Sequence, residues 1–197
     1  MKRKSRELYT YIIGGKYRGK KIALPSPDVT RSSKSRLRES VFNTLQFDIV
    51  GSNFIEMFGG SGSVGLEAIS RGAKKAWFIE LDRDSFNILT ANSAALDPAR
   101  CDLRYGDAFE VLPEILRELR ERGEKCYLYI DPPFSIREGS SDIYEKVLET
   151  IGMIDPDVII SIIVEHMSRE AMPQRVGPFE KFKEKKFGKS SLSYYKS

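Results

Sequence analysis

Apolar and polar positions recur along the chain with two different periods, one typical of strands and one typical of helices. After Gly51, strand-like and helix-like segments alternate regularly. Such alternation predicts an α/β fold with right-handed crossovers and a mostly parallel sheet covered on both faces. The predicted strands are residues 53–58, 75–81, 101–105, 126–131 and 158–165, and the predicted helices are residues 62–71, 83–96, 108–122 and 142–151.

Both ends of the chain depart from this alternation and read as hairpins. At the N-terminal end, Gly14 and Gly15 separate two short extended runs and predict a tight turn, because glycine adopts positive φ without steric cost. At the C-terminal end, a second pair of runs predicts antiparallel strands added at one edge of the sheet. The four runs are residues 8–13, 16–24, 180–187 and 191–196.

Between the first hairpin and the alternating region, residues 33–47 have the apolar spacing of a helix with one buried face. Arg36 and Arg38 are expected to lie off that face. The first 40 residues carry twelve Lys or Arg against three acids, a charge of +9, whereas the remaining residues carry −5. This asymmetry predicts a basic extension, residues 1–47, that binds a polyanion beside a catalytic domain of residues 48–197.

Composition argues against several classes of protein. The chain has no run of eighteen apolar residues, and no apolar stretch with a cleavage site follows its basic start, so we expect a cytoplasmic protein without a membrane span. Cys101 and Cys126 lie in strand-like patterns and are expected to be packed thiols. His166 is expected to be a surface or strand-end residue, and no metal site is predicted.

A glycine-rich turn follows the first strand of the alternating region. Gly60, Gly62 and Gly65 satisfy G-x-G-x-x-G, and Glu80 lies about twenty residues further on, where nucleotide-binding folds place a ribose-binding acid. This motif alone fits both NAD and S-adenosylmethionine. Glu56 favours the second, because a carboxylate suits the cationic amino group of the methionine part and would repel a pyrophosphate.

Asp107 follows the third strand of this region and precedes a helix. It is placed to accept a hydrogen bond from an adenine amine, to cap the helix, or to do both. The predicted cofactor-binding residues are Glu56, Phe58, Gly60, Gly62, Glu80, Leu81, Asp107 and Ala108.

The tetrad Asp131-Pro132-Pro133-Phe134 ends the fourth strand and is the predicted catalytic motif. Two prolines cannot continue a ladder, so the backbone beyond the strand is stiff. A carboxylate oxygen of Asp131 and the carbonyl of Pro132 can each accept one hydrogen of a planar amine, which leaves the nitrogen lone pair facing a methyl donor. Phe134 is expected to stack on the base. This geometry suits any planar amine, including DNA adenine and protein glutamine.

Four segments together resemble the RsmD family of bacterial 16S ribosomal RNA guanine-N2 methyltransferases: residues 11–21, 35–43, 58–68 and 131–134. The resemblance implies the Rossmann-like, seven-stranded sheet of class I S-adenosylmethionine-dependent methyltransferases and N2-methylguanine as product. It also implies 16S ribosomal RNA or a small-subunit assembly intermediate as partner of a monomeric enzyme. The residues assigned to RNA are Lys16, Tyr17, Arg18, Lys20, Lys21, Arg31, Arg36 and Arg38.

The chain departs from the family pattern at several positions. Where the family usually has Arg-Pro-Thr, this chain has Arg31 followed by two serines, and Ser35 replaces a common Asp. Glu56 and Gly59 stand where Asp and Ala are common. Beside RNA methylation, three alternatives stay open: an amine methyltransferase acting on DNA or protein, a catalytically silent RNA-binding assembly factor, and an NAD oxidoreductase that would leave the tetrad unexplained.

Overall fold

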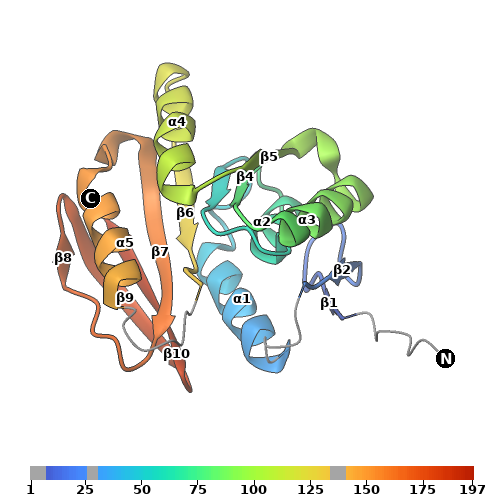
Figure 1. Cartoon of the computed structure of the whole chain (residues 1–197), viewed down its shortest axis with the longest axis horizontal. Coiled ribbons are helices and arrows are strands. Elements are labelled where there is room, and N and C mark those ends of the chain that lie inside the picture. The colour runs from blue at the N-terminus through green and yellow to red at the C-terminus, as the bar shows by residue number, and fades with distance from the viewer. Residues whose placement is uncertain (1–7, 26–30, 134–140) are drawn as a thin grey trace.

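The computed structural model describes residues 8–25, 31–133 and 141–197, which form a central sheet with helices on both faces (Figure 1). The strands of the sheet are β3 (Asn53–Glu56), β4 (Lys75–Glu80), β5 (Cys101–Tyr105), β6 (Cys126–Ile130), β7 (Ile159–Met167), β8 (Arg175–Val176), β9 (Phe179–Phe187) and β10 (Ser190–Lys196). The helices are α1 (Arg31–Leu45), α2 (Ser63–Ser70), α3 (Arg83–Leu96), α4 (Ala108–Glu121) and α5 (Ser141–Met153), with 3-10 turns at Pro98–Arg100 and Pro156–Val158.

The strands lie in the order β5-β4-β3-β6-β7-β10-β9-β8. The first five are parallel, and β10, β9 and β8 are antiparallel additions. The predicted fold class is therefore confirmed, including a C-terminal hairpin next to the parallel strands. The two-residue strand β8, which the sequence pattern did not indicate, forms the outer edge beyond that hairpin.

Strand β7 extends two residues beyond its predicted end because β10 pairs with it as far as Met167. His166 is the next-to-last residue of β7, so it lies near a strand end as one of the two expectations had it, whereas the other, a place at the surface, is wrong. His166 is 1% exposed, and its ring nitrogens contact the Ser193 hydroxyl at 2.9 Å and the Met167 carbonyl at 3.0 Å. Burial lowers the pKa of this imidazole. Cys126 is packed as expected, whereas Cys101 is only partly buried.

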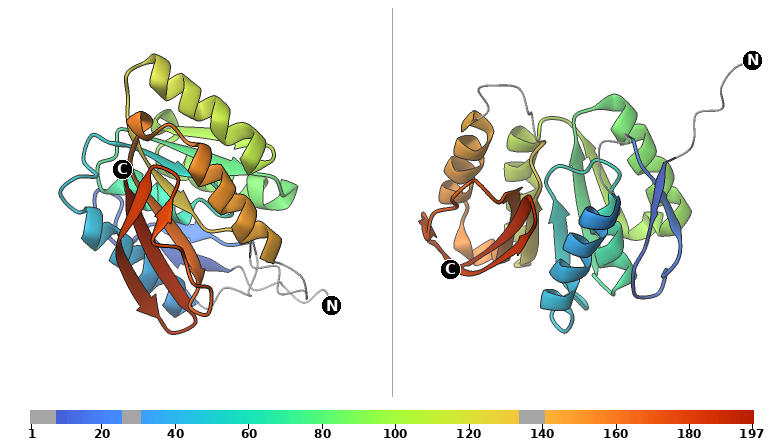
Figure 2. Two further views of the ribbon diagram at one scale, coloured as in Figure 1. Left: turned by 90° about the vertical axis from the view of Figure 1, so that its left-hand side faces the viewer. Right: turned by 90° about the horizontal axis from the view of Figure 1, so that it is seen from below.

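Two hydrophobic clusters fix the layers. Helices α4 and α5 pack on one face of the sheet around Trp77, Leu128 and Ile162. Helices α1, α2 and α3 cover the other face (Figure 2). There, the ring centroids of Phe42 on α1 and Phe54 on β3 are 5.9 Å apart. The N-terminal extension thus shares a core with the sheet, and its boundary at residue 47 stays a prediction about function.

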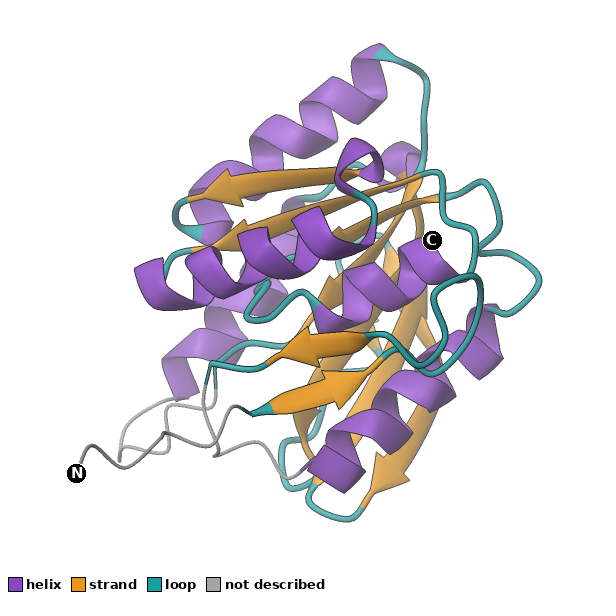
Figure 3. Ribbon diagram, turned by 90° about the vertical axis from the view of Figure 1, so that its right-hand side faces the viewer, coloured by secondary structure: helices purple, strands orange, loops and turns teal. Residues whose placement is uncertain are grey.

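The N-terminal hairpin consists of β1 (Tyr9–Tyr11) and β2 (Lys21–Ala23), which pair antiparallel beside α3 (Figure 3). The predicted tight turn at Gly14 and Gly15 is wrong, because Tyr11 pairs with Lys21 and residues 12–20 form a longer loop. We call residues 12–20 the hairpin loop. Asn92 of α3 fixes the hairpin by bonding both the N–H and the carbonyl of Ala23, at 2.9 and 3.0 Å.

The hairpin loop turns as it does because its backbone hydrogen bonds go to α2. The buried carboxylate of Glu67 accepts the N–H groups of Ile13 and Gly14 at 2.8 Å each, and the Ser70 carbonyl accepts that of Lys16 at 2.7 Å. Gly15 has φ +77°, and a Cβ there would lie 2.0 Å from the Ser70 carbonyl oxygen. Only glycine permits this close approach.

Candidate active site

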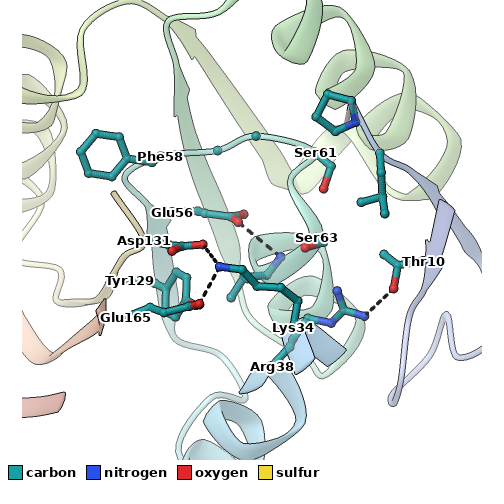
Figure 4. Close-up of a pocket in the computed structure, with 15 residues that line it drawn as sticks. Thr10, Lys34, Arg38, Glu56, Phe58, Ser61, Ser63, Tyr129, Asp131 and Glu165 are labelled. Carbon is teal, nitrogen blue, oxygen red and sulfur yellow. Dashed lines mark hydrogen bonds and ion pairs between the residues drawn. The ribbon is translucent and has the colours of Figure 1, made fainter. Parts of the chain in front are cut away.

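Two adjoining pockets lie where the parallel strands end, and Phe58, Gly60 and Asp131 line both. The larger pocket has a volume of about 810 Å³, within the range of small-molecule sites. The smaller lies between the sheet, α1 and the hairpin (Figure 4). Because the carboxyl ends of parallel strands meet at one edge, residues from β3, β4, β5 and β6 converge here.

Six of the eight predicted cofactor-binding residues line the larger pocket: Phe58, Gly60, Glu80, Leu81, Asp107 and Ala108. Glu56 lines the smaller pocket instead. Gly62 lines neither of these two. It has φ +76°, and a Cβ there would meet Leu89 at 2.4 Å, so its place is in the packing beneath the turn.

The glycine turn is held by Glu80. One carboxylate oxygen of Glu80 accepts the N–H of Gly60 at 2.6 Å, and the other accepts the N–H of Asp82 at 2.7 Å. Gly60 has φ +52°, and a Cβ there would meet no atom within 4 Å. The turn is therefore fixed from the sheet side and open toward the pocket, as a closely approaching ligand requires.

The walls of the larger pocket are largely apolar. The rings of Phe58 and Phe109 meet edge to face with 5.8 Å between centroids, and Leu81 is 60% exposed. Asp107 caps α4 by accepting the N–H of Phe109 at 2.8 Å, which confirms the helix cap. Its contact with an adenine amine stays a prediction. A planar, partly apolar ligand with a polar edge fits this arrangement.

Glu56 lies at the end of β3 beneath the start of α2. Its carboxylate is 4% exposed and accepts the N–H of Gly65 at 2.8 Å and that of Val64 at 3.4 Å. Burial raises the pKa of Glu56 to about 8, although these N–H groups favour the charged form. Burial therefore disfavours the ionised form of Glu56, and an ammonium group bound in the smaller pocket would stabilise that form.

Asp131 follows β6 and is paired with a residue that the sequence analysis did not select. The Lys34 ammonium of α1 lies 2.6 Å from Asp131 Oδ2 and 2.5 Å from Glu165 Oε1 (Figure 4). The second oxygen of Glu165 accepts the hydroxyl of Tyr129 at 2.6 Å. A cation and two carboxylates from different elements thus meet at the predicted catalytic aspartate.

Of the rest of the tetrad, the structure describes the two prolines. Pro133 is exposed and lines the larger pocket beside Asp131, whereas Pro132 is buried and is not among the lining residues. Phe134 falls outside the described residues. Its stacking role and the amine-accepting role of the Pro132 carbonyl stay predictions.

The residues assigned to RNA differ in their exposure. Lys16, Arg18, Lys20 and Lys21 are exposed on the hairpin, and Arg36 is exposed on α1. Tyr17 is partly buried and donates its hydroxyl to Asp97 at 2.8 Å, which ties the hairpin loop to the body. The side chain of Arg31 falls outside the described residues.

The prediction that Arg38 lies off the apolar face of α1 and contacts RNA is not met by its position, because Arg38 lies on the buried side of this helix and is 3% exposed. Its guanidinium donates to the Tyr11 carbonyl at 2.6 Å and lies 3.5 Å from Glu67. The physical reason is that Glu67 is fully buried and needs cationic partners, which Arg38 and Arg71 supply. Arg38 joins the helix to the hairpin and is left out of the RNA surface proposed below.

Lys34, Glu165 and Tyr129 are the site residues that the sequence reasoning missed. One signal was present: Glu165 is the one acid in the mainly apolar strand β7 next to β6. Because Ile130 pairs with Val164, Asp131 and Glu165 follow in register. Nothing in the spacing of Lys34 pointed to this contact.

The described residues contain no group of three or more His, Cys, Asp or Glu side chains that could hold a metal ion. No helix among them is long and apolar enough to cross a membrane.

Proteins similar to this chain in sequence and fold are named as methyltransferases. The family model described as "Conserved hypothetical protein 95" matches residues 10–196. "Ribosomal RNA small subunit methyltransferase D" of Escherichia coli (strain K12) is 32% identical over 185 residues, covering 93% of this chain and 88% of that protein. The solved structure "Putative methyltransferase yhhF from Escherichia coli" superposes with a TM-score of 0.72 at 29% identity, covering 95% of this chain and 97% of that one.

A more distant structure bears on the fold alone. Its title describes a "putative methyltransferase complexed with SAH", and it superposes with a TM-score of 0.62 at 13% identity, covering 92% of this chain and 52% of that one.

Proposed function

We propose that this chain, which belongs to the family described as "Conserved hypothetical protein 95", transfers a methyl group from S-adenosylmethionine to the exocyclic N2 amine of a guanine in 16S ribosomal RNA. The resemblance to the RsmD family is confirmed by the Escherichia coli relative. The observation that carries the proposal is the shared wall of the two pockets. Asp131 borders both the larger pocket, with its glycine turn and Glu80, and the smaller pocket, with Glu56.

The donor set fits S-adenosylmethionine at both ends. Glu80 and Leu81 would hold the ribose and adenine, with Asp107 at the edge of the base, and Glu56 would face the methionine ammonium. The open side of Gly60 leaves room for the ligand beside the backbone. The bound cofactor supplies an activated methyl group on a sulfonium. An NAD oxidoreductase is disfavoured because Glu56 would face a pyrophosphate.

The chemical task of the chain is to orient an amine. The lone pair of an aryl amine is delocalised into the ring, so the nitrogen must be held with that pair facing the methyl carbon. Asp131 accepts one amine hydrogen and the Pro132 carbonyl accepts the other. The nitrogen would become cationic as it takes the methyl group that the cofactor would supply, and the cofactor would depart without that group. The nearby Asp131 carboxylate would stabilise the positive charge until the extra proton is released to water.

The basic side chains of the hairpin support an RNA partner. Lys16, Arg18, Lys20 and Lys21 project from the hairpin, and Arg36 projects from the helix that reaches Asp131 through Lys34. Exposed cations of this kind contact phosphates without distinguishing the nucleotide sequence, and the pocket then selects the base. Action on 16S ribosomal RNA or a small-subunit assembly intermediate, as a monomer in the cytoplasm, completes the proposal.

Methyl transfer to defined RNA tests the proposal. Purified protein is incubated with S-adenosylmethionine and unmethylated small-subunit RNA or particles, and the digested nucleosides are identified by mass spectrometry. We expect N2-methylguanosine. Methyladenine formed in DNA or methylglutamine formed in protein would select those alternatives, and absence of transfer to any of them would favour the silent assembly factor.

Two variants of Asp131 test how the amine is held. Asp131→Asn keeps an accepting oxygen and should retain measurable activity, whereas Asp131→Ala should lose nearly all of it. Equal inactivity of both variants, with cofactor binding intact, would instead assign Asp131 the task of removing a proton.

A further inference from the structure

Lys34 is a partly buried cation that the proposed chemistry does not yet use. Its side chain is 28% exposed, and its ammonium bridges Asp131, 26% exposed, and Glu165, 1% exposed. Glu165 is therefore a carboxylate almost without access to water, and its hydrogen-bond partners are Lys34 and Tyr129. An ionised carboxylate at such a depth needs a cation to offset its desolvation.

The surroundings of this cluster carry an excess of acids. Among the described residues, the charged and titratable side chains around it are Lys34 and Arg38 on α1, Glu56 on β3, Tyr129 and Asp131 at the end of β6, Tyr144 on α5 and Glu165 on β7. Arg38 is already engaged by Glu67 and by the Tyr11 carbonyl. The ammonium that contacts both Asp131 and Glu165 directly is that of Lys34.

We infer that Lys34 is a positioning residue for methyl transfer: its ammonium bridges Asp131 and Glu165 and favours the ionised form of this pair, so that Asp131 can accept the target amine. This inference rests on the proposed function, because it assumes that Asp131 contacts that amine. The contact also engages Oδ2 of Asp131. Its Oδ1, although buried, has no hydrogen-bond partner among the described residues, so the carboxylate keeps accepting capacity.

The titration of the cluster agrees with this geometry. Burial and the charge of Asp131 raise the pKa of Glu165 to about 7, and Lys34 opposes that rise. Burial disfavours the charge on Lys34, but the two carboxylates raise its pKa above the ordinary value. Without Lys34, two neighbouring carboxylates would share a site with no cation between them and would take up a proton at higher pH.

The pH dependence of single-turnover methylation tests the inference in five proteins: wild type, Lys34→Met, Lys34→Arg, Lys34→Met/Glu165→Gln and the control Lys74→Met. Lys74 pairs with Glu124 at 2.5 Å on the surface, away from both pockets. Lys34→Met should move the acidic limb of the rate profile upward by about one pH unit or more. The rate below the limb then falls about tenfold per unit, while the apparent Kd for RNA is unchanged.

The other variants separate charge from fold. Lys34→Arg keeps a cation and should retain the wild-type limb. Lys34→Met/Glu165→Gln removes the negative charge of Glu165 together with the ammonium that offsets it, so the acidic limb should return toward lower pH. If Lys34→Met is unstable, this double variant still tests the inference. An equal loss of rate at every pH, or weaker RNA binding with an unmoved limb, would overturn the inference.

A measurement without substrate separates this inference from the proposed function. Carbon-13 resonances of the glutamate carboxylates report the titration of Glu165 in wild type and in Lys34→Met. We expect a higher pKa for Glu165 in the variant, and an unchanged pKa would contradict the role of Lys34. If wild type fails to methylate RNA, the proposed function fails, and the carboxylate titration still decides whether Lys34 sets the charge of the pair.

Discussion

Glu80, the last residue of β4, accepts a hydrogen bond at 2.6 Å from the backbone N–H of Gly60, which lies in the turn after β3. Its other oxygen holds the N–H of Asp82 at 2.7 Å. One carboxylate thus fixes the glycine turn after β3 and the start of the loop after β4. Since both segments line the larger pocket, its shape depends on this contact.

Glu80→Ala should weaken binding of S-adenosylhomocysteine by about 1.5–3 kcal/mol, because charge-assisted hydrogen bonds are lost and the turn is released. Isothermal titration calorimetry measures the effect. Asp84→Ala is the matched control, since Asp84 is an exposed acid in the first turn of α3 and does not line the pocket. Equal affinities for the two variants would argue against a cofactor site at Glu80.

Binding of the methionine ammonium should release a proton from Glu56. Burial raises the pKa of Glu56 to about 8, so this carboxyl is largely protonated at pH 7 in the free protein. A bound cation favours the ionised form, and the affinity should therefore rise as pH rises from 6 toward 8. Calorimetry in two buffers of different ionisation enthalpy counts the proton. Glu56→Gln should bind more weakly and release none, and a wild type that releases none would place the ammonium elsewhere.

The docking of the hairpin loop on α2 can be tested at two glycines with similar backbones. Gly15 and Gly19 have φ +77° and +83°, but only at Gly15 would a Cβ meet an atom within 4 Å, the nearest being the Ser70 carbonyl oxygen at 2.0 Å. Both substitutions by Ala incur backbone strain of about 1–3 kcal/mol, and Gly15→Ala adds the clash. Urea denaturation should find Gly15→Ala the less stable variant. Equal losses of stability would mean that the loop is not held against α2.

The positive charge of the hairpin should determine the affinity for RNA and leave the affinity for the cofactor unchanged. Neutralising Lys16, Arg18, Lys20 and Lys21 together should reduce the slope of log Kd against log salt by up to about 3.6, since each of the four lost phosphate contacts removes about 0.7–0.9. Filter binding at several salt concentrations measures this slope. A control neutralises four exposed cations on and after α4: Arg117, Arg120, Arg122 and Lys125. An equal effect of both sets would indicate a diffuse field rather than an RNA surface.

The sequence predicted those features that depend on local spacing. The period of apolar residues located the alternating strands and helices, and the spacing from Gly60 to Glu80 located an acid that proves to hold the glycine turn. The end of β7 was predicted less well, because the length of this strand depends on pairing with β10, where Met167 pairs with Ser190, 23 residues further on. That pairing, which the local pattern does not encode, placed His166 inside the sheet.

The errors in the N-terminal extension have the same origin. Gly14 and Gly15 suit a tight turn locally, but Glu67 and Ser70 offer their acceptors to this backbone from α2. Arg38 looks like a surface cation in a basic segment, yet the buried charge of Glu67 draws it inward. Lys34 reaches Asp131 across 97 residues of sequence, a contact that only the packing of α1 on the sheet creates.

If the chain methylates N2 of a guanine in 16S ribosomal RNA with Asp131 at the reacting amine, that methyl group depends on both the gene and this carboxylate. The most direct measurement is quantitative mass spectrometry of small-subunit RNA from cells whose gene for this chain is deleted, complemented with either wild type or Asp131→Ala. We predict that one N2-methylguanosine disappears on deletion, returns with wild type and stays absent with Asp131→Ala expressed at the same level. Unchanged N2-methylguanosine in the deletion, or full restoration by Asp131→Ala, would contradict the account.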